Sequence, residues 1–262
     1  MRVREKSAGG GIAVVTGATG GLGLAYANLL AGQGYDLIMT GRRIETLEAR
    51  AAELSRKHGV ACTGVHAELS TEAGIEELRG RLKQTEGIEV LVSNAGLGAT
   101  GTFLDGPLAR HLEMMRIHDM AAVSLVHAVL PGMLDRRRGF IVCLSSLASL
   151  VPRPGSELYT PTKAYLNSFI RCLDMSYRGM GIRFQALCPG FVHSDFHERL
   201  GIAREKQVDH GFHRWMECEE VVARSWRAFA RDRLIVVPGA LNRLVAGLYA
   251  VLPRRARYAI AK

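Results

Sequence analysis

The stretch "VVTGATGGLG", residues 14–23, joins a short apolar run to the start of an amphipathic segment. Gly17, Gly21 and Gly23 would let the backbone turn tightly and approach a pyrophosphate, whose charge meets the amino end of the following helix. Glycine-rich turns are common, so this trio alone is weak evidence. Its position between the first predicted strand and the first predicted helix makes it a candidate dinucleotide-binding loop. The other candidate cofactor-binding residues of this loop are Thr19, Gly20 and Leu22.

Short apolar runs alternate with amphipathic helical patterns along the whole chain. Strands this apolar, separated by helices, indicate a parallel sheet that is covered on both faces. With right-handed crossovers the pattern predicts an α/β fold, a doubly wound, Rossmann-like sheet of seven parallel strands with helices on both faces. The predicted strands are 12–16, 36–40, 59–65, 89–93, 140–145, 183–188 and 234–237, and the predicted helices are 21–33, 43–58, 71–86, 107–135, 157–180 and 217–230.

No linker rich in proline, glycine or serine divides the sequence, so we expect one domain over residues 11–239 after a flexible leader at 1–10. The polar and aromatic segment 193–216 follows the sixth predicted strand, at the sheet edge where ligands bind in open α/β folds. A long irregular connection of this kind is usually a lid or a binding loop. Residues 240–262 predict an apolar helix and a basic tail that could cover the pocket, pack on a partner subunit or touch a membrane. Packing on protein is favoured, because the tail supplies only the cationic flank of a membrane-surface helix.

The 262-residue chain is long enough to bury a full core, and 48% of its residues are hydrophobic and 23% charged. No run of about eighteen apolar residues predicts a transmembrane helix, and the first residues lack the apolar segment of a signal peptide. The five cysteines are scattered and lack metal-ligand spacing. They therefore predict reduced thiols in a cytoplasmic protein, and we expect no metal site.

The formal net charge is +9. The basic residues spread over predicted helix faces and do not gather with aromatic side chains, so we expect no nucleic-acid partner. Attraction to an anionic cofactor or to an anionic lipid surface fits this charge as well.

The second predicted strand ends in "IMTGRR", residues 38–43. An acidic residue here would hold the ribose 2′-hydroxyl of NAD, but Gly41, Arg42 and Arg43 occupy these positions. An arginine suits a 2′-phosphate through charge-assisted hydrogen bonds. The sequence thus favours NADP(H), and the alternative is a pair of solvated arginines at the start of a helix.

Three later motifs add to the glycine loop. In "SNAG", Asn94 can tie neighbouring strands together, while Ala95 and Gly96 let the backbone lie close to a cofactor. The motifs are "SNAG" (93–96), "SS…YTPTK" (145–163) and "CPG" (188–190). Together with "TGATGGLG" they resemble the short-chain dehydrogenase/reductase superfamily, in its order and spacing and over essentially the whole chain. The stretch 234–253 further resembles the branch that includes 17β-hydroxysteroid dehydrogenase-like and long-chain 3-ketoacyl reductases.

The resemblance implies a catalytic serine, tyrosine and lysine. The family pattern places the serine thirteen residues before the tyrosine, which selects Ser146 over Ser145, and the other two fall on Tyr159 and Lys163. Residues four apart on a helix share one face. We expect Ser146 to hold the substrate oxygen and Tyr159 to donate a proton to it as hydride arrives from the nicotinamide. The Lys163 ammonium, with the oxidised nicotinamide, should lower the Tyr159 pKa well below its usual value of about 10.

Further positions are implied by the same resemblance. Pro189 and Gly190 match the turn that covers the nicotinamide, and Ser194 stands where the family has a threonine that contacts the carboxamide. Glu68 stands where the family usually has an aspartate near the adenine. The remaining expected cofactor contacts are Leu69 and Val192.

His118 departs from the family, which usually has an asparagine here that helps a water relay protons to the lysine. An imidazole can also bridge a water and carry a proton, so His118 is a candidate catalytic residue. The alternative is a buried histidine that only fills space in the helix.

The resemblance implies an NADP(H)-dependent oxidoreductase that interconverts a ketone and a secondary alcohol, with reduction expected in cells. The branch and the apolar tail suggest a small hydrophobic substrate, such as an acyl, steroid or polyketide-like ketone. The alternatives are a nucleotide-sensing regulator without turnover and a membrane-surface scaffold. A regulator would be expected to lose the tyrosine or the lysine, and both are present. By resemblance alone, we expect a homodimer or homotetramer.

Overall fold

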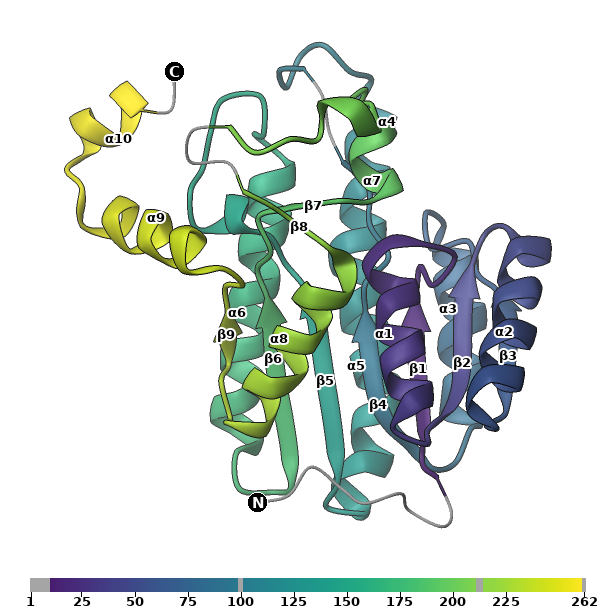
Figure 1. Cartoon of the computed structure of the whole chain (residues 1–262). Helices are drawn as coiled ribbons and strands as arrows, with labels where there is room; N and C mark the ends of the chain where they lie inside the picture. The colour runs from purple at the N-terminus through teal and green to yellow at the C-terminus, as the bar shows by residue number, and fades with distance from the viewer. Residues whose placement is uncertain (1–9, 99–100, 211–213, 261–262) are drawn as a thin grey trace.

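The computed structural model describes residues 10–98, 101–210 and 214–260 of the chain. Seven strands form one sheet: β1 (Ile12–Thr16), β2 (Asp36–Gly41), β3 (Cys62–His66), β4 (Ile88–Ser93), β5 (Gly139–Leu144), β6 (Ile182–Leu187) and β9 (Ile235–Val236). Their order is β3-β2-β1-β4-β5-β6-β9, and every neighbouring pair is parallel (Figure 1). The predicted doubly wound sheet is confirmed.

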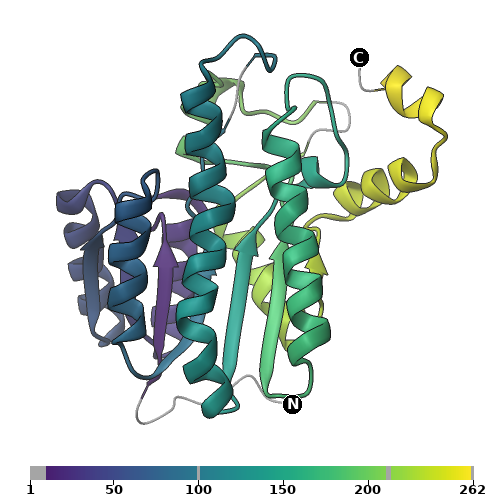
Figure 2. The ribbon, with the colours of Figure 1, turned by 180° about the vertical axis from the view of Figure 1, so that it is seen from behind.

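Helices cover both faces of this sheet, because its strands are apolar on both sides. One core cluster joins the sheet to α1 (Gly21–Gly32), α2 (Ile44–His58) and α8 (Cys218–Ala230). The other joins it to α3 (Glu72–Lys83), α5 (Ala121–Asp135) and α6 (Tyr159–Tyr177), which stand in front of the sheet in Figure 2. In β1, for example, Val14 faces the second cluster and Val15 the first, and both are fully buried.

The strand order reverses next to β1, which lies between β2 and β4. The carboxyl ends of parallel strands share one edge, and open α/β sheets bind ligands at the point where the order reverses. The loops after β1, β4, β5 and β6 therefore meet at the edge where the sequence motifs predict the site.

The predicted helix 107–135 is not one regular helix. It consists of α4 (Leu108–Met115), a π-helical turn (Arg116–Met120) that carries His118, and α5. The run Leu108–Asp135 is long and apolar enough to cross a membrane by composition, with a mean hydropathy of 1.4 over an 18-residue window. Half of that window is buried in the protein, and α5 packs on β4, β5 and α3. This is the arrangement of a core helix.

The segment 193–216 is more regular than the sequence suggests. It contains α7 (Asp195–Glu198) and a 3₁₀ turn (Arg204–Lys206), and its ends are joined by a parallel pair, β7 (Phe191–Val192) and β8 (Trp215–Met216). Strands of two residues carry no periodic signal, so this pair was not predicted.

The tail forms α9 (Ala240–Val251) and α10 (Arg254–Ile260), with the break at Leu252 and Pro253. Both helices project from the side of the domain near the carboxyl ends of the strands (Figures 1 and 2). Of the predicted leader, only Gly10 lies within the described residues.

Candidate active site

The glycine loop turns as its sequence predicts. Gly17 and Gly21 have φ angles of 65° and 54°, the left-handed region that favours glycine. A Cβ on Gly23 would lie 2.3 Å from the Gly17 carbonyl oxygen, so α1 can pack this closely on the loop only with glycine there. The first turn of α1 carries no acidic side chain. The bare backbone fits the pyrophosphate of a dinucleotide, and the Asp195 carboxylate lies beside this terminus, 3.4 Å from where a Cβ on Gly20 would be.

Asn94 holds the end of β4 against the glycine loop. Its side-chain Nδ2 donates to the carbonyl oxygens of Thr16 at 2.8 Å and Gly17 at 3.2 Å. The Thr16 hydroxyl in turn accepts from the backbone N–H groups of Asn94 and Ala95, each at 2.9 Å. The prediction that Asn94 ties neighbouring strands together is confirmed at the level of contacts.

The two arginines after β2 point to different surroundings. Arg43 donates to the Thr19 hydroxyl at 3.1 Å and lies 3.9 Å from the Asp195 carboxylate of α7. Arg42 is exposed, and its charge acts on the Glu68 carboxylate. Both guanidinium groups therefore lie on the rim between the glycine loop and the end of β3, where a 2′-phosphate would need them.

The Glu68 carboxylate is hydrogen-bonded within its own loop. Its Oε1 accepts from the Ser70 amide at 3.1 Å and from the Ser70 hydroxyl at 2.6 Å. Burial acts to raise the Glu68 pKa, but these hydrogen bonds and the nearby Arg42 charge outweigh it and lower the pKa. Leu69 is buried beneath this loop.

Ser145 and Ser146 differ in what they contact. The Ser145 hydroxyl is buried and lies 2.8 Å from the Lys163 carbonyl oxygen, to which it donates. The Ser146 hydroxyl accepts from the Ala148 amide at 3.1 Å and forms a hydrogen bond with the Tyr159 side chain. Ser146 is the serine that lies beside the tyrosine, as the spacing predicts.

Tyr159 begins α6 next to Ser146. Burial raises its pKa above the ordinary value of 10.0, and the Ser146 hydrogen bond offsets this only in part. The predicted lowering of the pKa is therefore absent from the chain alone. Burial is the dominant cause of the raised pKa; Lys163 Nζ lies 5.8 Å from the centre of the phenol ring and donates to the Leu144 carbonyl oxygen at 2.8 Å.

Lys163 is 5% exposed. Burial lowers the pKa of its ammonium from 10.5 to about 8, while the Asp119 carboxylate acts in the opposite direction. A Cβ on Gly96 would lie 3.6 Å from Lys163 Nζ and 3.0 Å from His118 Nε2. Glycine at position 96 thus leaves room for both side chains beneath the loop after β4.

His118 is buried between this loop and α6. Its Nε2 accepts from the Leu97 amide at 2.9 Å, so the ring hydrogen is on Nδ1, which donates to the Thr162 hydroxyl at 2.8 Å. The ring meets that of Tyr159 edge-on, with 5.7 Å between centroids. Burial and the Lys163 charge hold the His118 pKa well below 6.5. Both nitrogens are engaged in a neutral ring, which favours a structural role over contact with a relay water.

The turn after β6 places the remaining predicted residues. Pro189 accepts from the Leu147 amide at 2.8 Å. A Cβ on Gly190 would lie 2.7 Å from the Asn242 side chain, so α9 packs directly on this turn. Val192 is buried in β7, and the Ser194 hydroxyl donates to its carbonyl oxygen at 3.3 Å.

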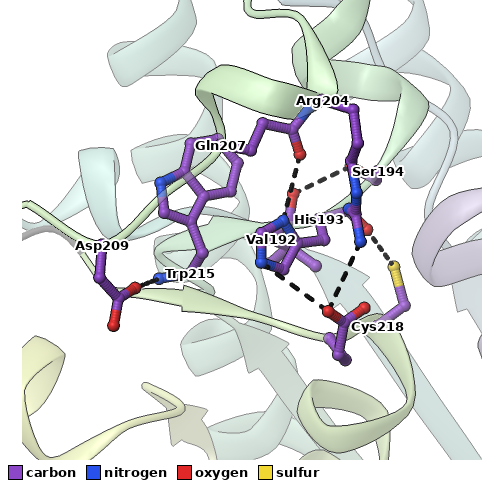
Figure 3. A network of polar contacts seen from close by, with 9 residues as sticks. Val192, His193, Ser194, Arg204, Gln207, Asp209, Trp215 and Cys218 are labelled. Carbon is purple, nitrogen blue, oxygen red and sulfur yellow. Dashed lines mark hydrogen bonds and ion pairs between the residues drawn. The ribbon is translucent and has the colours of Figure 1, made fainter.

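A polar and aromatic network fixes the base of the lid (Figure 3). The His193 ring stacks on Trp215 with 5.3 Å between centroids. His193 Nδ1 lies 3.4 Å from Gln207 Oε1, and its Nε2 lies 3.7 Å from the Glu217 carboxylate, which also pairs with Arg204 at 3.6 Å. His193 therefore links both ends of the segment 193–216 to one another.

A cavity of about 310 Å³ lies between the loop after β4, α4, the residues just before α6 and the segment 193–216, and Ser146, Tyr159 and Lys163 are not among its lining residues. The lid residue Leu200 packs over Gly98, and the Phe196 ring lies 6.3 Å from that of Tyr159. The residues that line the 310 Å³ cavity are Gly98, Gly101, Thr102, Phe103, Asp105, Gly106, Arg110, His111, Met114, Gly155, Glu157, Leu158, Arg199 and Leu200. A second hollow of about 440 Å³ lies between β3 and α3, and neither hollow is lined by a predicted site residue.

Sequence reasoning missed three residues of this site. Thr162 was quoted within "YTPTK" but was not recognised as the partner of His118. Among the described residues, one buried oxygen of Asp119 has no hydrogen-bond partner, and burial raises the Asp119 pKa to about 7 although Lys163 acts to lower it. Phe196 lies in a segment without periodicity, and only its proximity to Tyr159 in space marks it.

All five cysteines are free. Within the part of the chain that the structure describes, no three His, Cys, Asp or Glu side chains are grouped as metal ligands.

Known proteins share this sequence and this architecture. A sequence model of the family described as short chain dehydrogenase matches residues 11–205. The chain is 36% identical over 188 residues to the very-long-chain 3-oxoacyl-CoA reductase of Anas platyrhynchos, a match covering 70% of this chain and 60% of the relative. It is 37% identical over 180 residues to hydroxysteroid dehydrogenase-like protein 1 of Gallus gallus, covering 68% of this chain and 54% of the relative. The chain thus spans only a little over half the length of these two relatives.

A solved structure extends the comparison to three dimensions. The short-chain dehydrogenase from Sphingobium yanoikuyae in complex with NADPH matches with a TM-score of 0.82 and 27% identity, over 93% of this chain and 97% of that one. The two relatives above also confirm the predicted resemblance to the hydroxysteroid and long-chain 3-ketoacyl reductase branch. The chain belongs to the short-chain dehydrogenase family.

Proposed function

We propose that the protein is an NADP(H)-dependent oxidoreductase that interconverts a ketone and a secondary alcohol and works in cells as a ketoreductase. The observation that carries this proposal is the meeting of Ser146, Tyr159 and Lys163 at the same sheet edge as the glycine loop. Oxidoreduction of alcohol and ketone groups is the chemistry of the family, and an intact set of the three side chains argues against a regulator without turnover.

In the proposed mechanism, Ser146 donates a hydrogen bond to the substrate carbonyl oxygen. Tyr159 then donates its phenolic proton to that oxygen as it becomes an alkoxide. The Tyr159 phenol is protonated at neutral pH, as a proton donor must be, although burial raises its pKa and so makes it a weaker acid. A bound nicotinamide supplies the hydride to the carbonyl carbon.

Lys163 has an electrostatic part in this scheme. Its Nζ lies 5.8 Å from the Tyr159 ring centre, and its charge stabilises the phenolate that remains after proton transfer. The hydrogen bond to the Leu144 carbonyl fixes the ammonium in place. We assign His118 a positioning role, since its ring contacts Tyr159 and bonds to Thr162 one turn along α6.

The preference for NADP(H) is part of the proposal. Arg42 and Arg43 follow β2 where an acidic residue would favour NAD, and a guanidinium suits a 2′-phosphate. Arg43 is already directed to the glycine loop by its hydrogen bond to Thr19. The matching Sphingobium yanoikuyae structure holds NADPH, which agrees with this choice.

The proposed substrate is a hydrophobic carbonyl compound of the acyl, steroid or polyketide-like kind. Phe196 lies beside Tyr159. The lining of the cavity combines apolar and charged side chains: Phe103, Met114, Leu158 and Leu200 with Asp105, Arg110, Glu157 and Arg199. The duck relative is named for a long-chain 3-oxoacyl substrate, which places such acyl ketones first among the candidates. We further propose a cytoplasmic homodimer or homotetramer and a lid over 193–216, as family likeness suggests.

One experiment tests this function. A panel of ketones of increasing chain length, including 3-oxoacyl thioesters and steroid ketones, is offered with NADPH and scored by loss of cofactor absorbance. We expect turnover with at least one hydrophobic ketone and none by the Tyr159→Phe variant. Tight NADPH binding without turnover on any member of the panel would favour the nucleotide-sensing regulator instead.

A further inference from the structure

Helix α9 carries an apolar stripe that the described part of the chain leaves uncovered. Leu244, Leu248 and Val251 are 55%, 54% and 79% exposed. They are spaced four and three residues apart, so they share one face of the helix. On the neighbouring α10, Tyr258 is 63% exposed.

The same tail is strongly basic. The last acidic residue of the sequence is Asp232, and the five arginines and one lysine that follow have no carboxylate among them. Arg254 and Arg255 are exposed at the start of α10. Arg257 is used within the tail, where it donates to the carbonyl oxygens of Leu252 and Ala250.

The tail is anchored to the domain at one side only. Asn242 is buried against Gly190 and donates to the Pro238 carbonyl at 2.8 Å, while the Tyr249 hydroxyl donates to Pro152 at 3.4 Å. Beyond these contacts α9 and α10 lead away from the sheet (Figures 1 and 2). Isolated helices as short as these are unstable in water, so a surface that covers the stripe would stabilise them.

We propose that α9 and α10 form a docking surface for an anionic lipid bilayer. Leu244, Leu248 and Val251 would enter the headgroup region, and Arg254 and Arg255 would contact lipid phosphates. The charge of the tail favours a lipid bilayer over a second copy of the chain as the surface that covers the apolar stripe. Two such tails facing each other would bring like charges together, whereas an anionic bilayer offers both an apolar layer and the opposite charge.

Sedimentation with vesicles tests the proposal on the full chain without substrate, so its outcome is independent of the proposed catalysis. Wild type is mixed with vesicles of phosphatidylcholine alone or with about one third phosphatidylglycerol. We expect binding to the anionic vesicles that weakens with salt, and little binding to the neutral ones. Replacing Arg254 and Arg255 by alanine should lower the partition coefficient about 30-fold, from roughly fivefold for each arginine. Replacing Leu244, Leu248 and Val251 by serine should lower it at least tenfold.

Two matched controls are available elsewhere on the surface. Met175→Ser changes a methionine of α6 that is 83% exposed, and Arg56→Ala with Lys57→Ala on α2 removes the same charge as the tail pair. Both should bind vesicles as wild type does. No binding to anionic vesicles, or an equal loss in the α2 variant, would overturn the proposal. So would a dimer in light scattering that the serine variant abolishes, since the stripe would then be covered by a second copy.

Discussion

The imidazole of His118 donates from Nδ1 to the Thr162 hydroxyl at 2.8 Å, which links the π-helical turn before α5 to the helix that carries the proposed acid. The Thr162 hydroxyl in turn donates to the Tyr159 carbonyl oxygen at 2.9 Å. A chain of two hydrogen bonds thus joins His118 to the first residue of α6. The position of the phenol depends on this linkage as well as on its own contact with Ser146.

Substitution of His118 should therefore impair turnover through position and not through proton transfer. His118→Leu leaves the Leu97 amide without its acceptor, and a buried unpaired N–H costs about 1–3 kcal/mol. We expect a lower free energy of unfolding and at least a tenfold loss of kcat. His118→Gln, which can still accept from Leu97, should recover part of both. Chemical denaturation and steady-state kinetics measure the two effects.

The pH profile separates positioning from relay. A relay imidazole would add an ionisation between about pH 5 and 8 that disappears with His118. The burial that lowers the His118 pKa predicts instead that wild type and His118→Gln have the same profile. An ionisation near pH 7 that persists in both proteins would belong to another group, and Asp119 is the candidate. Loss of an ionisation with His118 would restore the relay hypothesis.

Tyr159→Phe tests the general acid. It removes the phenolic proton while leaving the ring and the backbone of α6 in place. We expect NADPH binding to be unchanged and kcat to fall by about 10²-fold or more, the scale of general acid catalysis. Tyr165→Phe is the matched control, because Tyr165 lies on the same helix and is 45% exposed. Near-wild-type turnover by Tyr159→Phe would remove Tyr159 from the mechanism.

The sheet was predictable because its information is local and periodic. The run Ile12–Thr16 is apolar on both faces, and the glycines that follow fix the turn through backbone geometry alone. The spacing from Ser146 to Lys163 was equally readable from the sequence. These features need no knowledge of distant side chains.

What the sequence could not give depends on contacts across long separations. The sequence predicts that Lys163 lowers the Tyr159 pKa. In the structure Lys163 Nζ donates to the Leu144 carbonyl oxygen, and burial raises the Tyr159 pKa. The pairing of β7 with β8 joins segments more than twenty residues apart without any pattern in either. The contact between Phe196 and Tyr159 likewise joins residues 37 positions apart, with 6.3 Å between ring centroids.

The cofactor preference can be tested with Arg42→Ala and Arg43→Ala. One charge-assisted hydrogen bond contributes roughly 1.5–3 kcal/mol, so we expect NADPH to bind about 10- to 100-fold more tightly than NADH. The double variant should lose most of that difference by weakening NADPH binding alone. Arg50→Ala on α2, whose side chain pairs with Glu53, controls for the loss of charge. Equal dissociation constants for the two cofactors in wild type would contradict the assignment.

Phe196→Ala should change which substrates are used. The ring stands 6.3 Å from that of Tyr159 on the lid side, so its removal enlarges the site next to the reacting carbonyl. One apolar contact of this kind is worth about 10- to 200-fold in discrimination. We expect kcat/KM to fall for small ketones relative to bulky ones, with NADPH affinity unchanged. Phe103→Ala, which changes an aromatic residue that lines the cavity, is the comparison. An identical change in substrate preference in both variants would show that Phe196 has no specific effect on substrate choice.

Lys163 gives a prediction for stability against pH. In the folded chain its pKa is lowered by burial to about 8, whereas the ordinary value is 10.5. Between these two values the unfolded chain binds more protons than the folded one, so this group makes stability rise with pH. The full effect is on the order of 3 kcal/mol, at about 1.4 kcal/mol per pKa unit.

Lys163→Met removes that contribution, together with the effect of the Lys163 charge on the pKa values of Asp119 and His118. The free energy of unfolding is measured by denaturant titration from pH 7 to 10. We expect the free energy of unfolding of wild type, relative to that of the variant, to rise by up to about 3 kcal/mol between pH 7 and 10, mostly above pH 8. At pH 7 the variant should be close to wild type in stability, because it removes a buried charge but leaves the Leu144 carbonyl without its donor. A constant difference from pH 7 to 10 would mean that Lys163 keeps its ordinary pKa in the folded protein, and its proposed role beside the Tyr159 phenolate would then rest on geometry alone.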